Sequence, residues 1–266
     1  MTKHIFSKLH HPCIVAFCAI QLCLISEIHA QNELEDFDLE AHRRHYNSLP
    51  AVEESDATLQ KSSQFNHFLK EAEEIVTRFE FESFMGLRLI HRHFDLGKNQ
   101  LMTEEYKVVD HLPSLVTSAR YVESAKEINT VPSSWIFSSQ SNEPVQLFET
   151  STDSAVKTAS ALLHNSPEFT EEMGNLLREH SLTDLLSVAV LKRESLVASP
   201  DQVYMEVNYG DTNSSVVQLW NASDSPGGSI RTSWSFKGPR QHTCHYEYYC
   251  ANIDGQHWNI AAGHHN

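Results

Sequence analysis

The chain is rich in imidazole side chains, and they gather at two places. His91 and His93 flank one arginine at the end of an apolar run, and five of the 17 histidines lie near the C-terminus. Neutral imidazole is a good ligand for zinc, copper and nickel. Side chains two residues apart on an extended chain point the same way, so both rings can meet one ion. His91 and His93 are therefore candidate metal ligands, and a hydrogen-bonded or solvated pair is the alternative.

The second group of histidines lies beside two cysteines. Its candidate metal ligands are His242, His257 and His264, and the cysteines are Cys244 and Cys250. Two cysteines so close in sequence predict a disulfide in an oxidising compartment, which leaves only imidazoles for zinc or copper. The spacing fits no zinc-finger pattern. The alternatives are a polar surface tail beside a disulfide, or a segment that folds back to complete the first pair.

The motif His91-x-His93-x-Asp95 resembles part of the metallo-β-lactamase motif, which has a further histidine where this chain has Leu96. Later residues that follow the family's order are His164, Asp211, and then His242 or His257. The resemblance implies a zinc-dependent hydrolase centred on His91, His93 and Asp95, in which a metal-bound hydroxide attacks an ester or amide. Leu96 removes a ligand of the second metal. The helical pattern before the motif and the low glycine content also differ from that fold.

The segment Gly86–Phe94 also resembles uncharacterised, largely fungal proteins in which a hydrophobic strand ends in His-Arg/Lys-His-Phe. Residues 131–135, Val-Pro-Ser-Ser-Trp, are similar to a Val-Pro-x-x-Trp further along those proteins. The resemblance covers two short stretches. It implies a eukaryotic secreted protein and no particular activity.

The first histidine pair stands at the end of a predicted strand. Residues 84–94 alternate in the manner of a strand, which places Leu87 and Leu89 on the face of the two histidines. Arg88 and Ile90 then lie on the opposite face. Any chemistry of the two histidines therefore depends on where this strand places their side chains.

Shorter extended segments follow this strand. We expect it to end at residues 95–97 and to pair with a short strand at 105–109. Residues 131–135 are typical of a loop that enters another strand, and residues 145–148 predict a further one. The acid pair Glu104-Glu105 stands in a context that looks solvated.

Helices are predicted on both sides of these strands. Apolar residues at helical spacing over 65–79, with charged residues between them, predict an amphipathic helix. A second helix is expected at 154–163. A third begins at Ser166-Pro167, where serine can cap the helix and proline suits its first turn. Residues 182–191 are strongly apolar.

The C-terminal part predicts strands. Residues 203–209, 215–220 and 230–236 are β-rich and separated by turn residues, which indicates an antiparallel meander. Helices and separate groups of strands without regular alternation favour an α+β fold. We therefore expect a single α+β domain over 63–266, an antiparallel sheet packed with several helices, with a β-rich part at about 202–266.

The first thirty residues predict a secretory signal peptide. A basic start precedes an apolar run at 13–25, and Ala30 is a small residue at the expected cleavage site. A retained membrane anchor is the alternative. Residues 31–62 are acidic and poor in aliphatic side chains, so we expect a poorly ordered arm. The mature protein is thus expected to be extracellular, with no membrane contact after cleavage.

Composition narrows the function classes. The formal net charge of −15 argues against nucleic acid and anionic membranes as partners. No nucleophile elbow, phosphate loop or dinucleotide fingerprint occurs. Sequons at Asn213 and Asn221 predict glycans in a eukaryotic secreted protein. The sequence therefore predicts a secreted protein that binds an extracellular protein or small molecule, with possible transition-metal binding, and a zinc-dependent hydrolase is the alternative.

Overall fold

The computed structural model covers most of the chain after residue 37. It describes residues 38–123, 130–140, 144–191, 202–209, 212–221, 223, 229–236, 246–253 and 256–263, and only the backbone for 144–148, 203, 229 and the strands after 245. The predicted signal peptide, residues 1–30, lies outside these ranges. None of the helices within them is long and apolar enough to cross a bilayer.

The described ranges contain five helices and eleven strands. The helices are α2 (Leu39–Ser48), α3 (Val52–Leu59), α4 (Phe65–Arg78), α5 (Ser154–His164) and α6 (Pro167–Glu179). The first strands are β1 (Met85–Leu89), β2 (Gln100–Val109), β3 (Leu112–Tyr121), β4 (Val131–Phe137), β5 (Pro144–Ser151) and β6 (Leu186–Val190). The later strands are β7 (Gln202–Tyr209), β8 (Ser214–Asn221), β9 (Ser229–Ser235), β10 (Tyr246–Ile253) and β11 (Gln256–Gly263).

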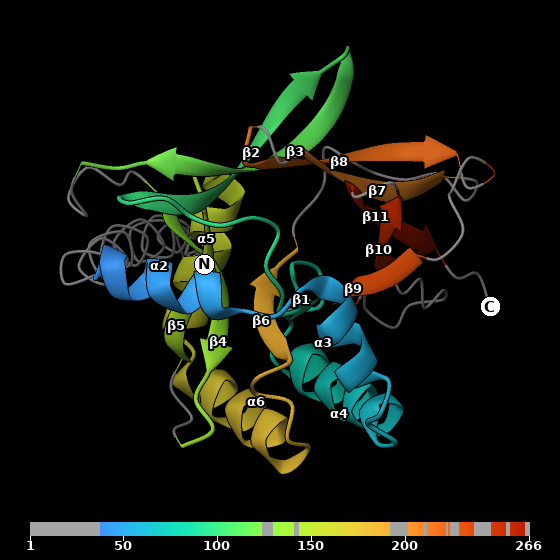
Figure 1. Ribbon diagram of the computed structural model, residues 1–266. Helices are drawn as coiled ribbons and strands as arrows, with labels where there is room; N and C mark the ends of the chain where they lie inside the picture. The colour runs from blue at the N-terminus through green and yellow to red at the C-terminus, as the bar shows by residue number, and fades with distance from the viewer. Residues whose placement is uncertain are drawn as a thin grey trace, which may run out of the picture.

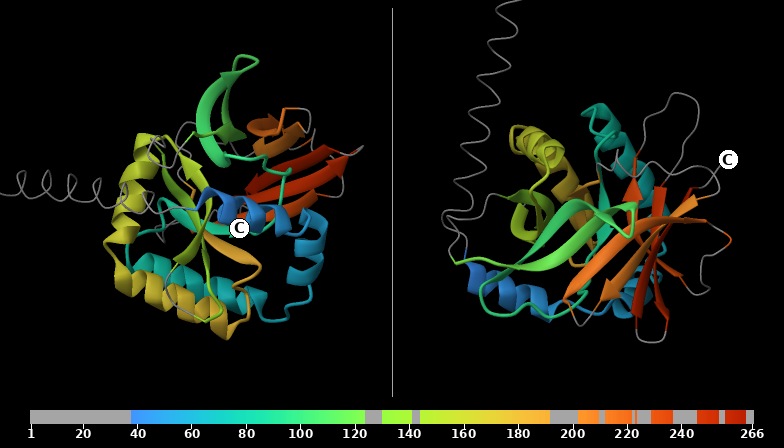
Figure 2. Two further views of the ribbon diagram at one scale, coloured as in Figure 1. Left: turned by 60° about the vertical axis from the view of Figure 1, so that its left-hand side comes forward. Right: turned by 90° about the horizontal axis from the view of Figure 1, so that it is seen from above.

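The described strands form one curled sheet in the order β10-β11-β7-β8-β3-β2-β5-β4-β6-β1-β9. Its pairs are antiparallel, except that β2 runs parallel to β5 and β10 touches β7 in parallel. β9 and β10, at opposite ends of this order, lie against each other, so the sheet bends round on itself (Figures 1 and 2). The predicted fold class, an α+β unit with an antiparallel sheet and several helices, is confirmed.

The main hydrophobic core lies between β1, β4, β6 and β9 and the helices α3 to α6. Alternation along β1 places Met85, Leu87 and Leu89 in this core, where they meet buried side chains such as Phe68 and Phe169. Helix α4 follows the predicted apolar spacing, and α6 begins at the predicted proline. Arg88 lies on the other face of β1, as its place in the alternation predicts.

The described part of the predicted acidic arm is folded. Residues 38–62 contain α2 and α3, and Tyr46, Val52 and Leu59 are among the most buried side chains. The Ser55 hydroxyl donates a hydrogen bond to the Ile90 carbonyl at 2.7 Å, which ties α3 to the end of β1. The expectation of poor order is wrong here because a few apolar side chains, spaced along two short helices, face the core.

Three predicted strand boundaries or pairings are corrected. β1 ends at Leu89, so His91 and His93 lie in the connection that follows it. β1 pairs with β6 and β9, whereas β2 pairs with β3 and β5. β9 therefore does not continue a meander from β8. Because β1 is buried on both faces, the backbone hydrogen-bonding groups at both of its edges need partner strands. β6 and β9 provide these partners, and β2, the next strand in sequence, does not.

The predicted loop at residues 131–135 is part of strand β4, which is buried along its whole length.

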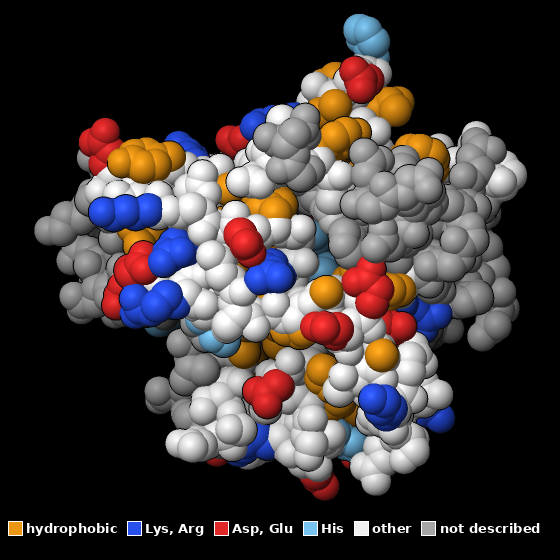
Figure 3. Space-filling model, viewed as in Figure 1, with side chains coloured by type: hydrophobic (Ala, Val, Ile, Leu, Met, Phe, Trp, Pro, Cys, Tyr) orange, Lys and Arg blue, Asp and Glu red, His pale blue; other side chains and the backbone are white. Residues whose placement is uncertain are grey.

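The β2–β3 hairpin projects from the body of the molecule (Figure 1). Asp110 and His111 have φ values of 50° and 70° at its turn. Figure 3 shows hydrophobic side chains on this projection, consistent with the exposed Val108 and Leu112, and a mixture of acidic and basic side chains elsewhere on the same face.

Candidate functional site

One face of the sheet carries a row of polar side chains across five strands. Strand register pairs Asn208 of β7 with Ser215, Ser215 with Thr117, Thr117 with Glu104, and Glu104 with Ser151 of β5. Paired positions place their side chains on the same face of a sheet. All five residues are buried. We call them the polar row, and the face of the sheet that bears them the polar face.

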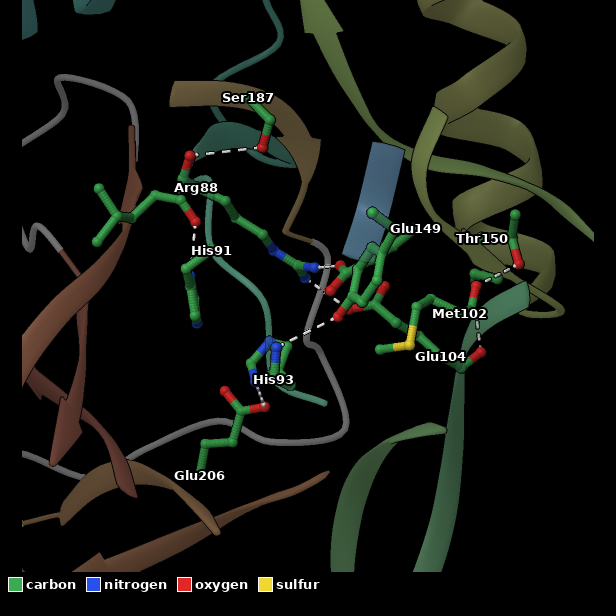
Figure 4. A network of polar contacts seen from close by, with 12 residues as sticks. Arg88, His91, His93, Met102, Glu104, Glu149, Thr150, Ser187 and Glu206 are labelled. Atoms are coloured by element: carbon green, nitrogen blue, oxygen red, sulfur yellow. Dashed lines mark hydrogen bonds and ion pairs between the residues drawn. The ribbon is translucent and has the colours of Figure 1, made fainter. Parts of the chain in front are cut away.

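Arg88 joins the polar row from β1. Its guanidinium forms ion pairs with Glu104, at 2.6 Å between Nη2 and Oε1, and with Glu149 of β5 (Figure 4). Its backbone carbonyl accepts a hydrogen bond from the Ser187 hydroxyl of β6. One buried cation thus binds two buried carboxylates, the arrangement that offsets the large cost of placing charge away from water.

The predicted histidine pair lies beside these ion pairs. The His91 and His93 rings have centroids 4.5 Å apart, and His91 Nδ1 lies 2.8 Å from the Leu89 carbonyl oxygen. His93 Nδ1 faces Glu206 Oε1 of β7 at 3.6 Å, and both side chains are less than a tenth exposed (Figure 4). The two rings thus lie side by side, although both residues follow the strand and do not belong to it.

Tyr46 of α2 covers the histidines from the helical side. The backbone N–H of His93 donates to the Tyr46 hydroxyl at 3.4 Å. Burial raises the pKa of the Tyr46 phenol well above its usual range, so this hydroxyl stays protonated. Tyr46 therefore contributes a neutral polar group to the site.

Two small apolar clusters flank the buried charges. On the polar face of β2, Met102 belongs to a cluster with Ile90 and Ile136, and Tyr106 packs against a cluster with Leu115. Glu104 stands between them on the same strand. The apolar flanks lower the local dielectric, which strengthens the interactions of the charges between them.

The described side chains gather several ionisable groups here. Three carboxylates, on Glu104, Glu149 and Glu206, lie with one guanidinium and two imidazoles. We call Arg88, Glu104, Glu149, Glu206 and the histidine pair the ionic cluster.

Further polar atoms of this face have no hydrogen-bond partner among the described residues. They are Ser134 Oγ of β4, Ser215 Oγ of β8 and Asn208 Oδ1 of β7. Ser134 shares the face of Arg88 and Glu149 through the pairing of β4 with β5 and β6. Since most buried polar atoms in proteins are hydrogen-bonded, these three atoms are suited to receive a polar group from outside the chain.

No protein-family model matches this chain, no curated protein matches it significantly, and no solved structure matches it significantly. The functional argument therefore rests on the geometry of the ionic cluster and the polar row.

The residues of the predicted hydrolase motif are not all brought together. Asp95 is mostly exposed and pairs with Arg92 at 3.1 Å, whereas the histidine pair is buried. His164 stands at the exposed end of α5. Asp211 lies outside the described residues. Within the described ranges, no group of three or more His, Cys, Asp or Glu side chains is arranged to hold a metal ion.

The C-terminal candidates are only partly covered. His242, Cys244 and His264 lie outside the described residues. Cys250 lies on β10 and His257 on β11, both known by their backbone alone. The disulfide and the C-terminal metal ligands therefore stay predictions.

The predicted glycosylation sites lie at the two ends of β8. Asn213, with φ of 46°, is in the turn between β7 and β8, and Asn221 is exposed at the end of the strand. Ser215, the hydroxyl residue of the first sequon, is buried in the polar row. Glycosylation at both positions stays a prediction.

Sequence reasoning missed the carboxylates of the ionic cluster. The sequence predicts that Glu104 is solvated together with Glu105, but its side chain is only 3 % exposed. The available signal was alternation, since Glu104 is in phase with Met102 and Tyr106. Glu206 is likewise in phase with the buried Tyr204.

Proposed function

We propose that this protein is a secreted binding protein that holds a small polar ligand on the polar face, next to the ionic cluster. The observation that carries the proposal is a pair of buried polar atoms without described partners, Asn208 Oδ1 and Ser215 Oγ, at paired positions of β7 and β8. A buried polar atom without a partner costs about 1–3 kcal/mol. A site that supplies such atoms favours a ligand that can bond to them.

The charged side chains next to the proposed site would make it selective among ligands. Arg88 fixes Glu104 and Glu149, so their carboxylates are held in place before any ligand arrives. Fixed groups bind at a lower entropic cost than mobile ones. The polar row then extends the set of donors and acceptors over neighbouring strands. We infer from this that the ligand is small and carries several hydrogen-bonding groups.

Zinc or copper is the simplest cation that this proposal includes. His91, His93 and Glu206 are the nearest set of nitrogen and oxygen donors, and imidazole with carboxylate suits such metals. The 3.6 Å between His93 Nδ1 and Glu206 Oε1 is an ion-pair separation. Ligand atoms lie about 2 Å from a zinc ion, so metal would have to draw these side chains together.

The proposal is tested on the full chain, secreted from a host and purified without a histidine tag. Native mass spectrometry measures any bound small molecule, and elemental mass spectrometry measures zinc and copper. Sequencing of the N-terminus checks cleavage after Ala30. We expect a bound molecule or metal in the wild type.

Three variants locate the binding. Asn208→Leu removes the acceptor of the polar row, His91→Ala with His93→Ala removes the imidazoles, and Thr158→Val on the exposed side of α5 is the control. We expect the first or second variant to lose the ligand and Thr158→Val to retain it. A wild type that carries neither a small molecule nor a metal, or variants that all retain it, would contradict the proposal.

A further inference from the structure

The two sequons at the ends of β8 differ in how well an enzyme can reach them. Glycan transfer to a sequon requires both the asparagine side chain and the hydroxyl residue two positions later. Asn221 and Ser223 of the second sequon are both exposed. In the first sequon Asn213 is half-buried, and Ser215 is 0 % exposed. The fold therefore presents the second sequon and hides the hydroxyl of the first.

Ser215 is hidden because β8 is an interior strand of the sheet. It pairs with Asn208 of β7 on one edge of β8 and with Thr117 of β3 on the other. The Asn213 carbonyl also accepts a hydrogen bond from the Ala119 N–H, at 3.1 Å. An enzyme can therefore reach the whole first sequon only when the pairing of β3 with β8 opens.

Opening this pairing is costly because an apolar cluster lies on the same strands. Leu115 of β3 and Val217 of β8 are paired positions, and both belong to one buried cluster with Tyr204 of β7. The core strands of a protein open with a free energy close to that of global unfolding. The folded protein therefore presents the first sequon only in a small fraction of molecules.

We propose that Asn213 accepts an N-linked glycan only before β8 pairs with β3, whereas Asn221 also accepts one in the folded protein. In this transfer the asparagine amide nitrogen forms a bond to C1 of a sugar that is held on a lipid pyrophosphate. The bond from C1 to the pyrophosphate oxygen breaks, and the lipid pyrophosphate leaves with its electron pair. The amide nitrogen loses one proton.

The number of glycans then records the order of folding and modification. A chain that folds first carries a glycan at Asn221 alone, and a chain that meets the enzyme first carries glycans at Asn213 and Asn221. This inference involves no bound ligand, so its test is independent of the proposed function.

The test uses the full chain, made in a host that adds no glycans. The purified protein is incubated with an oligosaccharyltransferase and a lipid-linked oligosaccharide, and mass spectrometry of glycopeptides measures the rate at each asparagine. Both sequons end in serine, so the type of hydroxyl does not differ between them. We expect folded wild type to be modified at least tenfold faster at Asn221 than at Asn213. Equal rates at the two positions would overturn the proposal.

Two lysine substitutions on the β2–β3 hairpin test the role of the pairing. Leu115→Lys places a charge in the buried cluster and should break the pairing of β3 with β8, while both sequons stay intact. We expect it to raise the rate at Asn213 at least tenfold. Val108→Lys is the matched control, because Val108 is 74 % exposed near the hairpin turn, and its rate at Asn213 should equal that of wild type.

Hydrogen exchange shows whether Leu115→Lys has lost the pairing. A variant whose β8 amides exchange freely, but whose rate at Asn213 does not rise, would overturn the proposal. If the variant keeps the pairing, wild type is modified in increasing concentrations of urea, and the rate at Asn221 corrects for the activity of the enzyme. The ratio of the Asn213 rate to the Asn221 rate should rise with the unfolded fraction, and a constant ratio would contradict the proposal.

Discussion

Arg88 is the residue on which the ionic cluster depends. It forms ion pairs with two buried carboxylates, and it lies on a strand that is buried on both faces. Removing one partner of a buried ion pair leaves an uncompensated charge, which is more damaging than removing all of them. The consequences of a single substitution here can therefore be stated in advance.

Arg88→Met should destabilise the protein by about 3–5 kcal/mol, because Glu104 and Glu149 would stay buried without their cation. Adding Glu104→Gln and Glu149→Gln to the same chain should restore part of that loss. Urea unfolding measures both effects. The control is Arg78→Met, whose ion pair with Glu172 is largely exposed and is worth about 0–1 kcal/mol. Equal losses for the two arginines would show that the cluster is not buried in solution.

The sequence could predict part of this site at the residue scale. His91 and His93 are two residues apart, so local geometry alone brings their rings together. Glu206 reaches His93 only through the position of β7 in the sheet, and Glu149 reaches Arg88 only through β5. Local alternation could have marked Glu104 as buried, but it could not name Arg88 as its partner.

At the scale of elements, β1 depends on close contact with β9. A Cβ atom placed on Gly86 would lie 2.4 Å from the backbone oxygen of Trp234, nearer than side-chain carbons approach a backbone atom. Gly86 pairs with Ser235 in this part of the sheet. The glycine is required because β9 packs too closely for any side chain.

Gly86→Ala should therefore cost about 1–3 kcal/mol, the usual range for overpacking a core. The backbone of β9 would have to move, since Trp234 cannot withdraw its carbonyl by turning a side chain. Gly97→Ala is a matched control, because its nearest neighbour is the Gln100 side chain at 2.9 Å, which can turn away. Thermal unfolding compares the two. A Gly86→Ala protein as stable as the wild type would mean that β9 does not pair with β1 as described.

The positions of single helices and strands were easier to predict than the pairing and packing between them. Helical spacing identified α4, and serine with proline located the start of α6, because both signals are local. The pairing of β1 with β6 and β9 joins segments that are far apart in sequence, and no pattern within either segment encodes it. The helices α2 and α3 were not predicted for the same reason. Their apolar side chains are few, and they stabilise these helices only by packing against residues that are distant in sequence.

At the scale of the whole molecule, the fold brings a hydrophobic core and a polar face to opposite sides of the same strands. On β1, Leu87 belongs to the core and Arg88 to the ionic cluster. The content of helices and strands predicted the α+β class. The curl of the sheet, which brings β7 toward β1, was beyond the sequence because it depends on the complete strand order.

At the scale of the whole molecule, His45 should make a contribution to stability that is lost in mild acid. Burial lowers the pKa of His45, and the nearby Asp184 only partly opposes this effect. An unfolded chain takes up a proton on histidine near pH 6.5, whereas the folded protein resists that proton until the pH is lower. The unfolded state therefore binds more protons in this window, and stability is lost as the pH falls below about 6.5.

Urea unfolding of wild type and His45→Gln at pH 7.5, 6.5 and 5.5 tests this prediction. The variant should lose less stability between the first and last pH than the wild type does, because it has one fewer proton to take up on unfolding. His111→Asn is the control, since His111 is exposed at the β2–β3 turn and asparagine tolerates its positive φ. If His45→Gln and His111→Asn follow the wild-type pH dependence equally, the helix α2 that carries His45 does not shield it from water, and its packing against the sheet is looser than described.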